Sequence, residues 1–194
     1  MDNYLLILYE KLKSSGHHNY LKRFNHSVGV SVTALKIAKE NNINLDLKKL
    51  YISSLLHDYS KYTNIEEYEK LLDKYEINKD VLNENVRVLH GICGYLVLKD
   101  ELGIEDEDIL NAVKYHVFGR PNMSVYEEIV YLSDFVEPNR IGEFYDEIRE
   151  YAYNDYKKAI GIASKKLIEY LEGLNEKIHP NAYLTYDYYK QFIK

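Results

Sequence analysis

Apolar residues recur every three or four positions along nearly the whole chain, which is the spacing of amphipathic helices. Leu5, Leu8 and Leu12 form one such stripe, and Ile160, Ala163 and Leu167 form another. Three prolines and nine glycines in 194 residues leave little of the turn punctuation that a sheet needs. The sequence therefore predicts an all-α protein, and its length fits a single domain.

The helix pattern divides this predicted domain, residues 1–194, into a metal-binding core at about 20–140 and C-terminal helices with a tail at 141–194. On the second helix, Val28, Val32 and Leu35 are expected to face inward, and Asp46 is placed to cap the third. The tail from Lys177 is assigned no element. The predicted helices cover 4–13, 21–41, 47–59, a run after a capping box of Thr63 and Glu66, 81–102 with a break near 83–85, a run from the acidic cluster 105–108 through His116, a run from a second capping box of Ser124 and Glu127 through Asp134, 144–153 and 156–174.

Charge and cysteine content exclude several classes of protein. The formal net charge is −6, and the cations form no long basic run, so a nucleic-acid-binding role is set aside. Cys93 is the single cysteine, which rules out an internal disulfide and favours a reducing compartment. The apolar residues 4–8 are followed at once by Glu10 and Lys11, too short a run for a membrane span or a signal peptide. We expect a cytoplasmic protein.

His57 and Asp58 follow directly after an apolar run. An imidazole and a carboxylate together suit a divalent transition metal. Successive helical residues point roughly 100° apart, so both could reach one ion only if the helix ran tangentially past it. The pair alone favours a simpler interpretation, a hydrogen-bonded histidine beside a surface aspartate.

Three further histidines and a second aspartate favour a metal site instead. His26, His90 and His116 each lie on or beside the apolar stripe of a predicted helix, and Asp134 lies among Val130, Leu132 and Phe135. Buried charged groups are costly unless they are paired or bind a metal. One inward histidine carries little weight, but four with two aspartates indicate a metal site.

The ordered set of these residues resembles the HD-domain metal-dependent phosphohydrolases, and the flanking residues are most similar to the YqeK family of symmetrically cleaving bis(5′-nucleosyl)-tetraphosphatases. The likeness runs from about Arg23 to the tail. The segments that carry it are Asn25-His26-Ser27, Leu55-Leu56-His57-Asp58-Tyr59-Ser60-Lys61, Leu89-His90-Gly91, Tyr115-His116-Val117-Phe118-Gly119-Arg120, Met123-Ser124, Leu132-Ser133-Asp134-Phe135-Val136-Glu137-Pro138-Asn139-Arg140 and Ile178-His179-Pro180.

The resemblance implies an HD-domain helical bundle that hydrolyses diadenosine tetraphosphate, or a related dinucleoside polyphosphate, to two ADP. A metal-activated water would attack an inner phosphorus. By the same resemblance, His26, His57, Asp58 and Asp134 would hold one metal, and Asp58 would bridge to a second metal completed by His90 and His116. The implied metal is iron in a di-iron centre. Mixed imidazole and carboxylate ligands fit manganese, cobalt and zinc as well.

The resemblance also suggests residues that act on the substrate. Asp58 and Lys61 are the expected catalytic residues, and Lys61, Arg120 and Arg140 are the expected phosphate contacts, because guanidinium and ammonium groups match phosphate oxygens. Glu137 is expected beside the substrate, orienting Arg140 or a histidine. The alternatives are a solvated helix-end lysine at Lys61 and an ordinary surface arginine at Arg120.

Val117-Phe118 stands where the family commonly has small polar residues, so the sequence fixes the substrate less closely than the metal ligands. Two other functions stay open: a different HD-domain nucleotide hydrolase, such as a nucleotidase or a dNTPase, and a non-catalytic module that binds metal and nucleotide. The oligomeric state is also open, with a homodimer as one option.

Overall fold

The computed structural model describes residues 2–193, which contain α-helices, two short 3-10 helices and no β-strand. The all-α prediction is confirmed. In chain order the elements are α1 (Asp2–Ser14), α2 (Tyr20–Glu40), α3 (Leu47–Leu56), α4 (Ile65–Lys74), η1 (Lys79–Asn83), α5 (Val86–Ile92), α6 (Gly94–Leu102), α7 (Glu107–Tyr115), α8 (Val125–Val136), α9 (Glu143–Ala152), α10 (Tyr156–Gly173), α11 (Pro180–Tyr189) and η2 (Lys190–Phe192).

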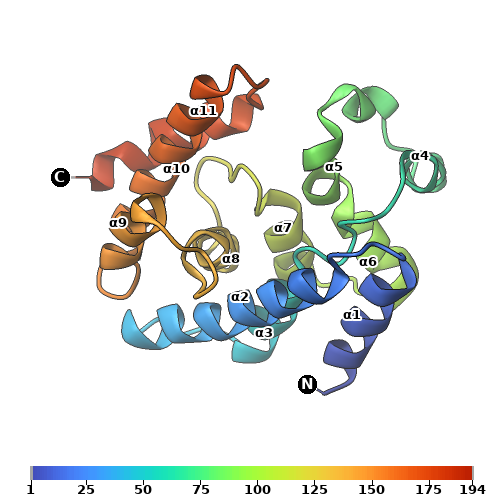
Figure 1. Ribbon diagram of the computed structural model, residues 1–194, viewed down its shortest axis with the longest axis horizontal. Helices are drawn as coiled ribbons and strands as arrows, with labels where there is room; N and C mark the ends of the chain where they lie inside the picture. Colours follow the sequence, from blue (N-terminus) through green and yellow to red (C-terminus); the bar gives the residue numbers. More distant parts are fainter. Residues whose placement is uncertain (1, 194) are drawn as a thin grey trace.

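Four helices, α2, α3, α7 and α8, pack against one another and form the centre of the molecule. Figure 1 shows α1, α4, α5 and α6 on one side of this centre and α9, α10 and α11 on the other. Two apolar clusters follow this division. Leu55, Leu89 and Val113 belong to the first, and Ile37, Val130 and Ile160 belong to the second. Helices α2, α3 and α7 contribute to both clusters, so they join the two sides.

Several helices begin at polar residues that accept hydrogen bonds from the first free backbone N–H groups. Asp46 caps α3 as predicted, and Ser124 caps α8 by accepting from the backbone of Glu127. The capping box of α4 was predicted one residue too early. It is formed by Asn64 and Glu67 rather than by Thr63 and Glu66, because Thr63 belongs to the preceding turn.

Some predicted boundaries are wrong where the chain turns near polar residues. The helix expected over 47–59 ends at Leu56, and the helix expected over 81–102 is divided into η1, α5 and α6. Val32, expected to face inward, is 60% exposed. The buried face of α2 uses smaller side chains instead, including Ser27, Ser31 and Ala34, which allow α2 to lie close to α3 and α8.

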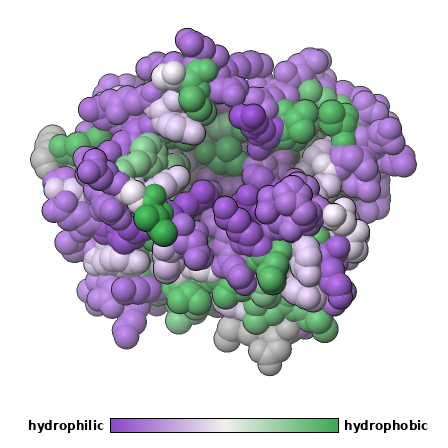
Figure 2. Space-filling view, in the orientation of Figure 1, coloured by the Kyte–Doolittle hydropathy of each residue, from purple (hydrophilic) through white to green (hydrophobic). Residues whose placement is uncertain are grey.

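The C-terminal tail, which was assigned no element, contains α11. His179 accepts from the backbone of Asn181 at its start, and Pro180 occupies the first turn, where its missing N–H is tolerated. Within residues 2–193, no helix has both the length and the apolar character needed to cross a bilayer. The face of the molecule seen in Figure 2 is hollowed near its centre.

Candidate metal centre

The predicted ligands come from separate elements and meet in one buried cluster. His26 lies on α2, His57 and Asp58 directly follow α3, His90 lies on α5, His116 directly follows α7, and Asp134 lies on α8. The four histidines and Asp58 are all buried, whereas the side chain of Asp134 is 23% exposed. His57 and His116 keep right-handed helical backbone angles. After α3 the backbone hydrogen bonds tighten to a span of three residues, from the N–H of Tyr59 to the carbonyl of Leu56 and from the N–H of Lys61 to the carbonyl of Asp58. His57 and Asp58 both contribute to the cluster although they are adjacent.

Asp58 lies at the middle of the cluster, with different neighbours on its two carboxylate oxygens. His90 Nε2 is 3.0 Å from Oδ1 and His116 Nε2 is 3.8 Å from it. His57 Nε2 is 3.4 Å from Oδ2, and His26 Nε2 is 3.7 Å from it. The four Nε2 atoms thus converge on one carboxylate, each of its oxygens facing two of them.

Hydrogen bonds to backbone carbonyls fix the rings of two histidines so that Nε2 points into the cluster. His57 Nδ1 donates to the carbonyl of Ser54 and His116 Nδ1 donates to the carbonyl of Val113, both at 2.7 Å. Because a carbonyl only accepts, Nδ1 carries a proton in both rings, and Nε2 is turned toward the cluster. Anchoring of the outer nitrogen is the usual arrangement of metal-binding histidines.

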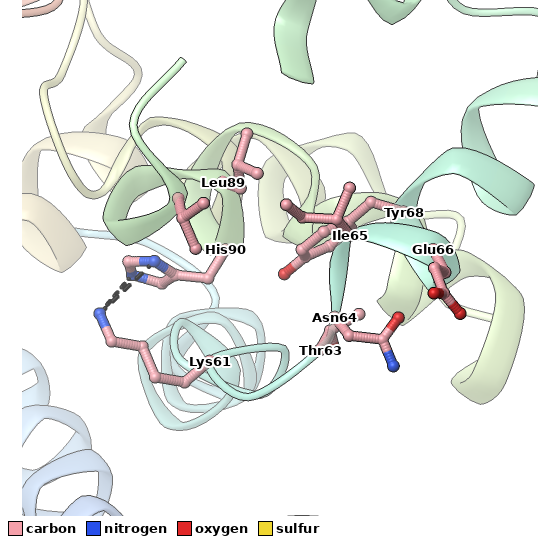
Figure 3. Close-up of a pocket in the computed structure, with 9 residues that line it drawn as sticks. Lys61, Thr63, Asn64, Ile65, Glu66, Tyr68, Leu89 and His90 are labelled. Carbon is pink, nitrogen blue, oxygen red and sulfur yellow. Dashed lines mark hydrogen bonds between the residues drawn. The ribbon is translucent and has the colours of Figure 1, made fainter. Parts of the chain in front are cut away.

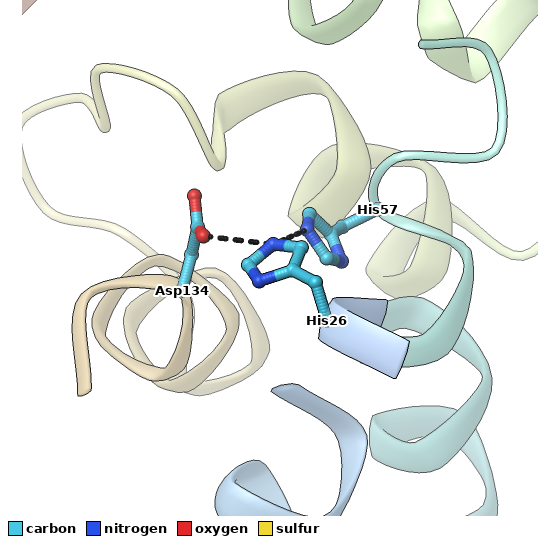
Figure 4. A group of neighbouring side chains, drawn as sticks. All are labelled: His26, His57 and Asp134. Atoms are coloured by element: carbon cyan, nitrogen blue, oxygen red, sulfur yellow. Dashed lines mark hydrogen bonds and ion pairs between the residues drawn. The ribbon is translucent and has the colours of Figure 1, made fainter. Parts of the chain in front are cut away.

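His26 is held by carboxylates on both sides of its ring. Its Nδ1 is 3.0 Å from Glu137 Oε1. On the other side, its Nε2 is 3.1 Å from Asp134 Oδ1 and 3.3 Å from His57 Nε2 (Figure 4). A Cβ at Gly29 would lie 2.7 Å from Glu137 Oε2. The glycine therefore gives Glu137 the space to reach His26 from beneath α2.

The charged groups strongly shift one another's pKa values. Burial alone would raise the pKa of Asp58, but the positive charges of Lys61, His57 and Arg23 hold it well below its usual range. Burial lowers the pKa of His116 to about 3, with added repulsion from His57 and His90. Asp58 is thus ionised and His116 neutral at pH 7, the protonation states in which these side chains bind metals.

His26 differs, because hydrogen bonds to Asp134 and Glu137 overcome its burial and raise its pKa to about 9. In the metal-free protein this ring is protonated at pH 7, and metal binding at Nε2 would release that proton.

The donor set fits a metal on two independent grounds. Among the described residues, Asp58 Oδ1 is buried and has no hydrogen-bond partner, although His90 Nε2 lies only 3.0 Å away. A buried carboxylate oxygen without a donor is costly, and a cation would satisfy it. In addition, ligand atoms of two triads each lie within 4.8 Å of one another: His26, His57 and Asp134, and His57, Asp58 and His116.

Two cations lie against the central carboxylate. Lys61 Nζ is 3.6 Å from Asp58 Oδ1 and donates to His90 Nε2 at 3.0 Å. Arg23 Nη1 donates to Asp58 Oδ2 at 2.5 Å. Arg23 was not predicted as a site residue, although it precedes His26 by three positions, which places both on one face of α2.

Arg140 and Arg120 occupy different settings. The guanidinium of Arg140 donates to the Asp134 carboxylate at 2.6 Å and to the Asp134 carbonyl at 2.9 Å. Arg120 instead forms two hydrogen bonds to buried Glu127, at 2.6 and 2.7 Å, and lies over the ring of Tyr115. The structure therefore brings Arg140 to the cluster, while Arg120 is engaged by a carboxylate outside it.

Phe118, one of the two residues that depart from the family pattern, is only 5% exposed. Its ring stacks on His179, with centroids 4.3 Å apart, and packs in an apolar cluster with Ile168 and Ala182. The packing role of this position explains an aromatic residue where a small polar one was expected.

Comparison with known proteins identifies this arrangement. The model of the HD domain family matches residues 23–139. This chain belongs to the HD domain family. The HD-domain protein is 34% identical over 166 residues to "Bis(5′-nucleosyl)-tetraphosphatase, symmetrical" of Bacillus subtilis, covering 86% of this chain and 88% of the relative. It is 35% identical over 165 residues to the protein of the same name from Halalkalibacterium halodurans, covering 85% and 87%.

A solved structure supports the same relationship. The crystal structure of a predicted HD superfamily hydrolase involved in NAD metabolism from Clostridium acetobutylicum superposes with a TM-score of 0.83 at 32% identity, covering 95% of each chain. The predicted relationship of this HD-domain protein to the symmetrical bis(5′-nucleosyl)-tetraphosphatases is confirmed by these matches.

The Glu137→Gln variant should bind metal about 10–100-fold more weakly, because a neutral amide holds the His26 ring less firmly than a carboxylate. The amide would also face two donors, since Glu137 Oε2 accepts from both the backbone and the side chain of Asn139. Titration with Mn²⁺ measures the change. The matched control is Glu127→Gln, which removes the carboxylate paired with Arg120 and should leave metal affinity unaltered. Equal metal affinities in the two variants would contradict the role given to Glu137.

Proposed function

We propose that this HD-domain protein is a metal-dependent hydrolase that cleaves diadenosine tetraphosphate symmetrically to two ADP. The observation that carries the proposal is the convergence of four imidazoles on the buried carboxylate of Asp58, in a chain that matches enzymes of that name over most of its length. The proposed metal ligands are His26, His57, Asp58, His90, His116 and Asp134. Iron in a two-metal centre is the proposed cofactor, and imidazole with carboxylate also suits manganese, cobalt and zinc.

In the proposed reaction, a water oxygen bonds to one of the two central phosphorus atoms, and the bond from that phosphorus to the central bridging oxygen breaks. A bound divalent metal supplies Lewis-acid stabilisation of charge on the phosphoryl oxygens and lowers the pKa of water. Lys61 and Arg23, which flank Asp58 from opposite sides, are assigned to neutralise phosphate charge. Arg140 orients Asp134, and Glu137 orients His26.

Elemental analysis of the purified protein, together with chromatography of the nucleotide products, tests this function. ADP as the sole product from diadenosine tetraphosphate supports symmetric cleavage. AMP with ATP would reject it, and nucleotide binding without turnover by the metal-loaded protein would favour a non-catalytic module. A cytoplasmic location is part of the proposal, because Cys93 is a free, buried thiol.

Replacing Arg23 by methionine should lower kcat/KM on the order of 10²-fold while the protein retains its metal. Methionine keeps much of the apolar stem of the arginine but removes the charge that lies 2.5 Å from Asp58 Oδ2. Steady-state kinetics and metal analysis on the same samples measure both effects. Arg87→Met is the control, because the Arg87 side chain is 79% exposed and pairs with Glu176 away from the cluster. Unchanged kinetics in Arg23→Met would remove Arg23 from the site.

A further inference from the structure

Two pockets adjoin the metal centre on different sides. The α4–α5 pocket lies between the turn after Asp58, the start of α4 and α5. Its volume is about 470 Å³, and its lining includes Lys61, Asn64, Val86 and His90 (Figure 3). The α2 pocket lies between the start of α2 and the segment after α8. Its volume is about 760 Å³, and its lining includes Arg23, His26, Tyr62, Arg140 and Ile141.

Asp58 separates the two pockets. Its Oδ1 faces His90 and Lys61, which line the α4–α5 pocket, whereas its Oδ2 faces Arg23 and His26, which line the α2 pocket. Lining residues of both pockets therefore meet at the carboxylate in the middle of the metal centre.

Cations are present on both sides of this path. Lys61 stands at the α4–α5 pocket, and Lys22, Arg23 and Arg140 stand at the α2 pocket. The protein as a whole carries a net charge of −6, so these local cations oppose the overall charge. A polyphosphate chain laid across Asp58 would meet a cation on each side.

Exposed apolar side chains mark the outer part of each pocket. Ile65 is 42% exposed and Val86 64% exposed at the α4–α5 pocket, while Leu21 is 50% exposed and Ile141 85% exposed at the α2 pocket. Single exposed apolar residues are common, but a pair beside a cation at both pockets matches a ligand with a flat apolar ring next to a phosphate.

The α2 pocket adds an aromatic surface. His17 stacks on Tyr62 with ring centroids 4.2 Å apart and an interplanar angle of 12°. Both residues line this pocket, which is the larger of the two. Flat aromatic faces of this kind stack with nucleobases.

We propose that one dinucleoside tetraphosphate occupies both pockets at once, with a nucleoside in each and the centre of the tetraphosphate over Asp58. This inference rests on the proposed function and adds a reason why the cleavage is symmetric. Because a nucleoside is held on each side of the metal centre, each half carries two phosphates up to the point of cleavage. The pockets, rather than the metals, thereby set which phosphoanhydride bond is broken.

Counting bound ADP by equilibrium dialysis in the presence of Mn²⁺ tests the two pockets without relying on turnover. The unaltered protein should bind two ADP per chain at saturation. Val86→Glu and Ile141→Glu each place a carboxylate at one pocket, so each variant should bind one ADP. Val32→Glu is the control, since Val32 is 60% exposed on α2 and lines neither pocket. A single ADP per unaltered chain, or variants that match Val32→Glu, would overturn the proposal.

Kinetics on the same variants give a second readout. Each pocket variant should raise KM for diadenosine tetraphosphate about tenfold, and the double variant about 100-fold, because effects at separate sites multiply. A double variant no worse than either single variant would contradict the occupation of both pockets. If the unaltered protein releases products other than ADP, the proposed function fails, whereas the ADP count still decides whether two nucleotide sites exist.

Discussion

Replacing Asp58 by alanine is expected to remove bound metal and turnover together. The carboxylate lies within 4 Å of the Nε2 atoms of His26, His57, His90 and His116, so its loss leaves both groups of imidazoles without their shared partner. We expect kcat/KM to fall about 10⁴-fold or more, as when a central catalytic group is deleted. Metal content should fall to the background measured for protein without a site. His57→Ala should have the same two effects.

The experiment must separate loss of the site from loss of the fold, because Asp58→Ala also removes the carboxylate that pairs with the partly buried Lys61 and Arg23. Asp58→Asn keeps the volume of the side chain, and circular dichroism of both variants reports their helix content. Asp73→Ala is the control, since that aspartate pairs with Lys79 at the surface. Full metal content and full turnover in a folded Asp58 variant would show that the metal centre has been assigned wrongly.

The Lys61→Ala variant is expected to keep its bound metal but lose turnover, whereas Asp58→Ala loses both. Lys61 donates to His90 and lies 3.6 Å from Asp58 Oδ1, but an ammonium group cannot bind a metal. Burial lowers the pKa of Lys61, and the charge of Asp58 opposes that shift. The variant should retain metal while kcat/KM falls on the order of 10²–10³-fold, because a partly buried cation beside the proposed phosphate site is lost.

Metal analysis and kinetics on one preparation test this separation. Lys74→Ala is the matched control, because Lys74 is an exposed helix-end lysine on α4 that pairs with Asp100. It represents the alternative in which Lys61 is merely solvated. Kinetics for Lys61→Ala equal to those of the control would support that alternative, and loss of metal would contradict the role given to Lys61.

Helical periodicity located most helices of this fold, because their apolar stripes are regular. The helix predicted over 156–174 is observed as Tyr156–Gly173, and the one predicted over 144–153 is observed as Glu143–Ala152. Helix α11 was missed, since four of its ten residues are tyrosines and its apolar residues do not form a distinct stripe. The sequence His179-Pro180 carries a recognisable helix start, an N-cap residue followed by proline.

The candidate ligands could be found from sequence because each is a polar residue within or beside an apolar stripe. Three-dimensional relations between distant positions could not be found in this way. Nothing in the spacing connects Gly29 to Glu137, yet the missing side chain at Gly29 admits the carboxylate that holds His26. The pairing of Arg120 with Glu127 likewise depends on the path of the loop between α7 and α8.

Arg23 shows a second limit of prediction from sequence. Its position three residues before His26 placed it on the right helix face, but many arginines share a face with some other polar residue. Only the approach of α2 to the end of α3 shows that Arg23 reaches Asp58. The choice between a site residue and a surface cation therefore depended on tertiary packing.

The proposed ligands are supplied by five different helical elements that meet at the junction of the two apolar clusters. An ion bound there would contact the native arrangement and have no equivalent site in the unfolded chain. By mass action, its binding free energy would then add to the free energy of unfolding. The lifetime of the folded protein would therefore depend on the free metal concentration. The same metal-binding equilibrium would control both activity and protein lifetime.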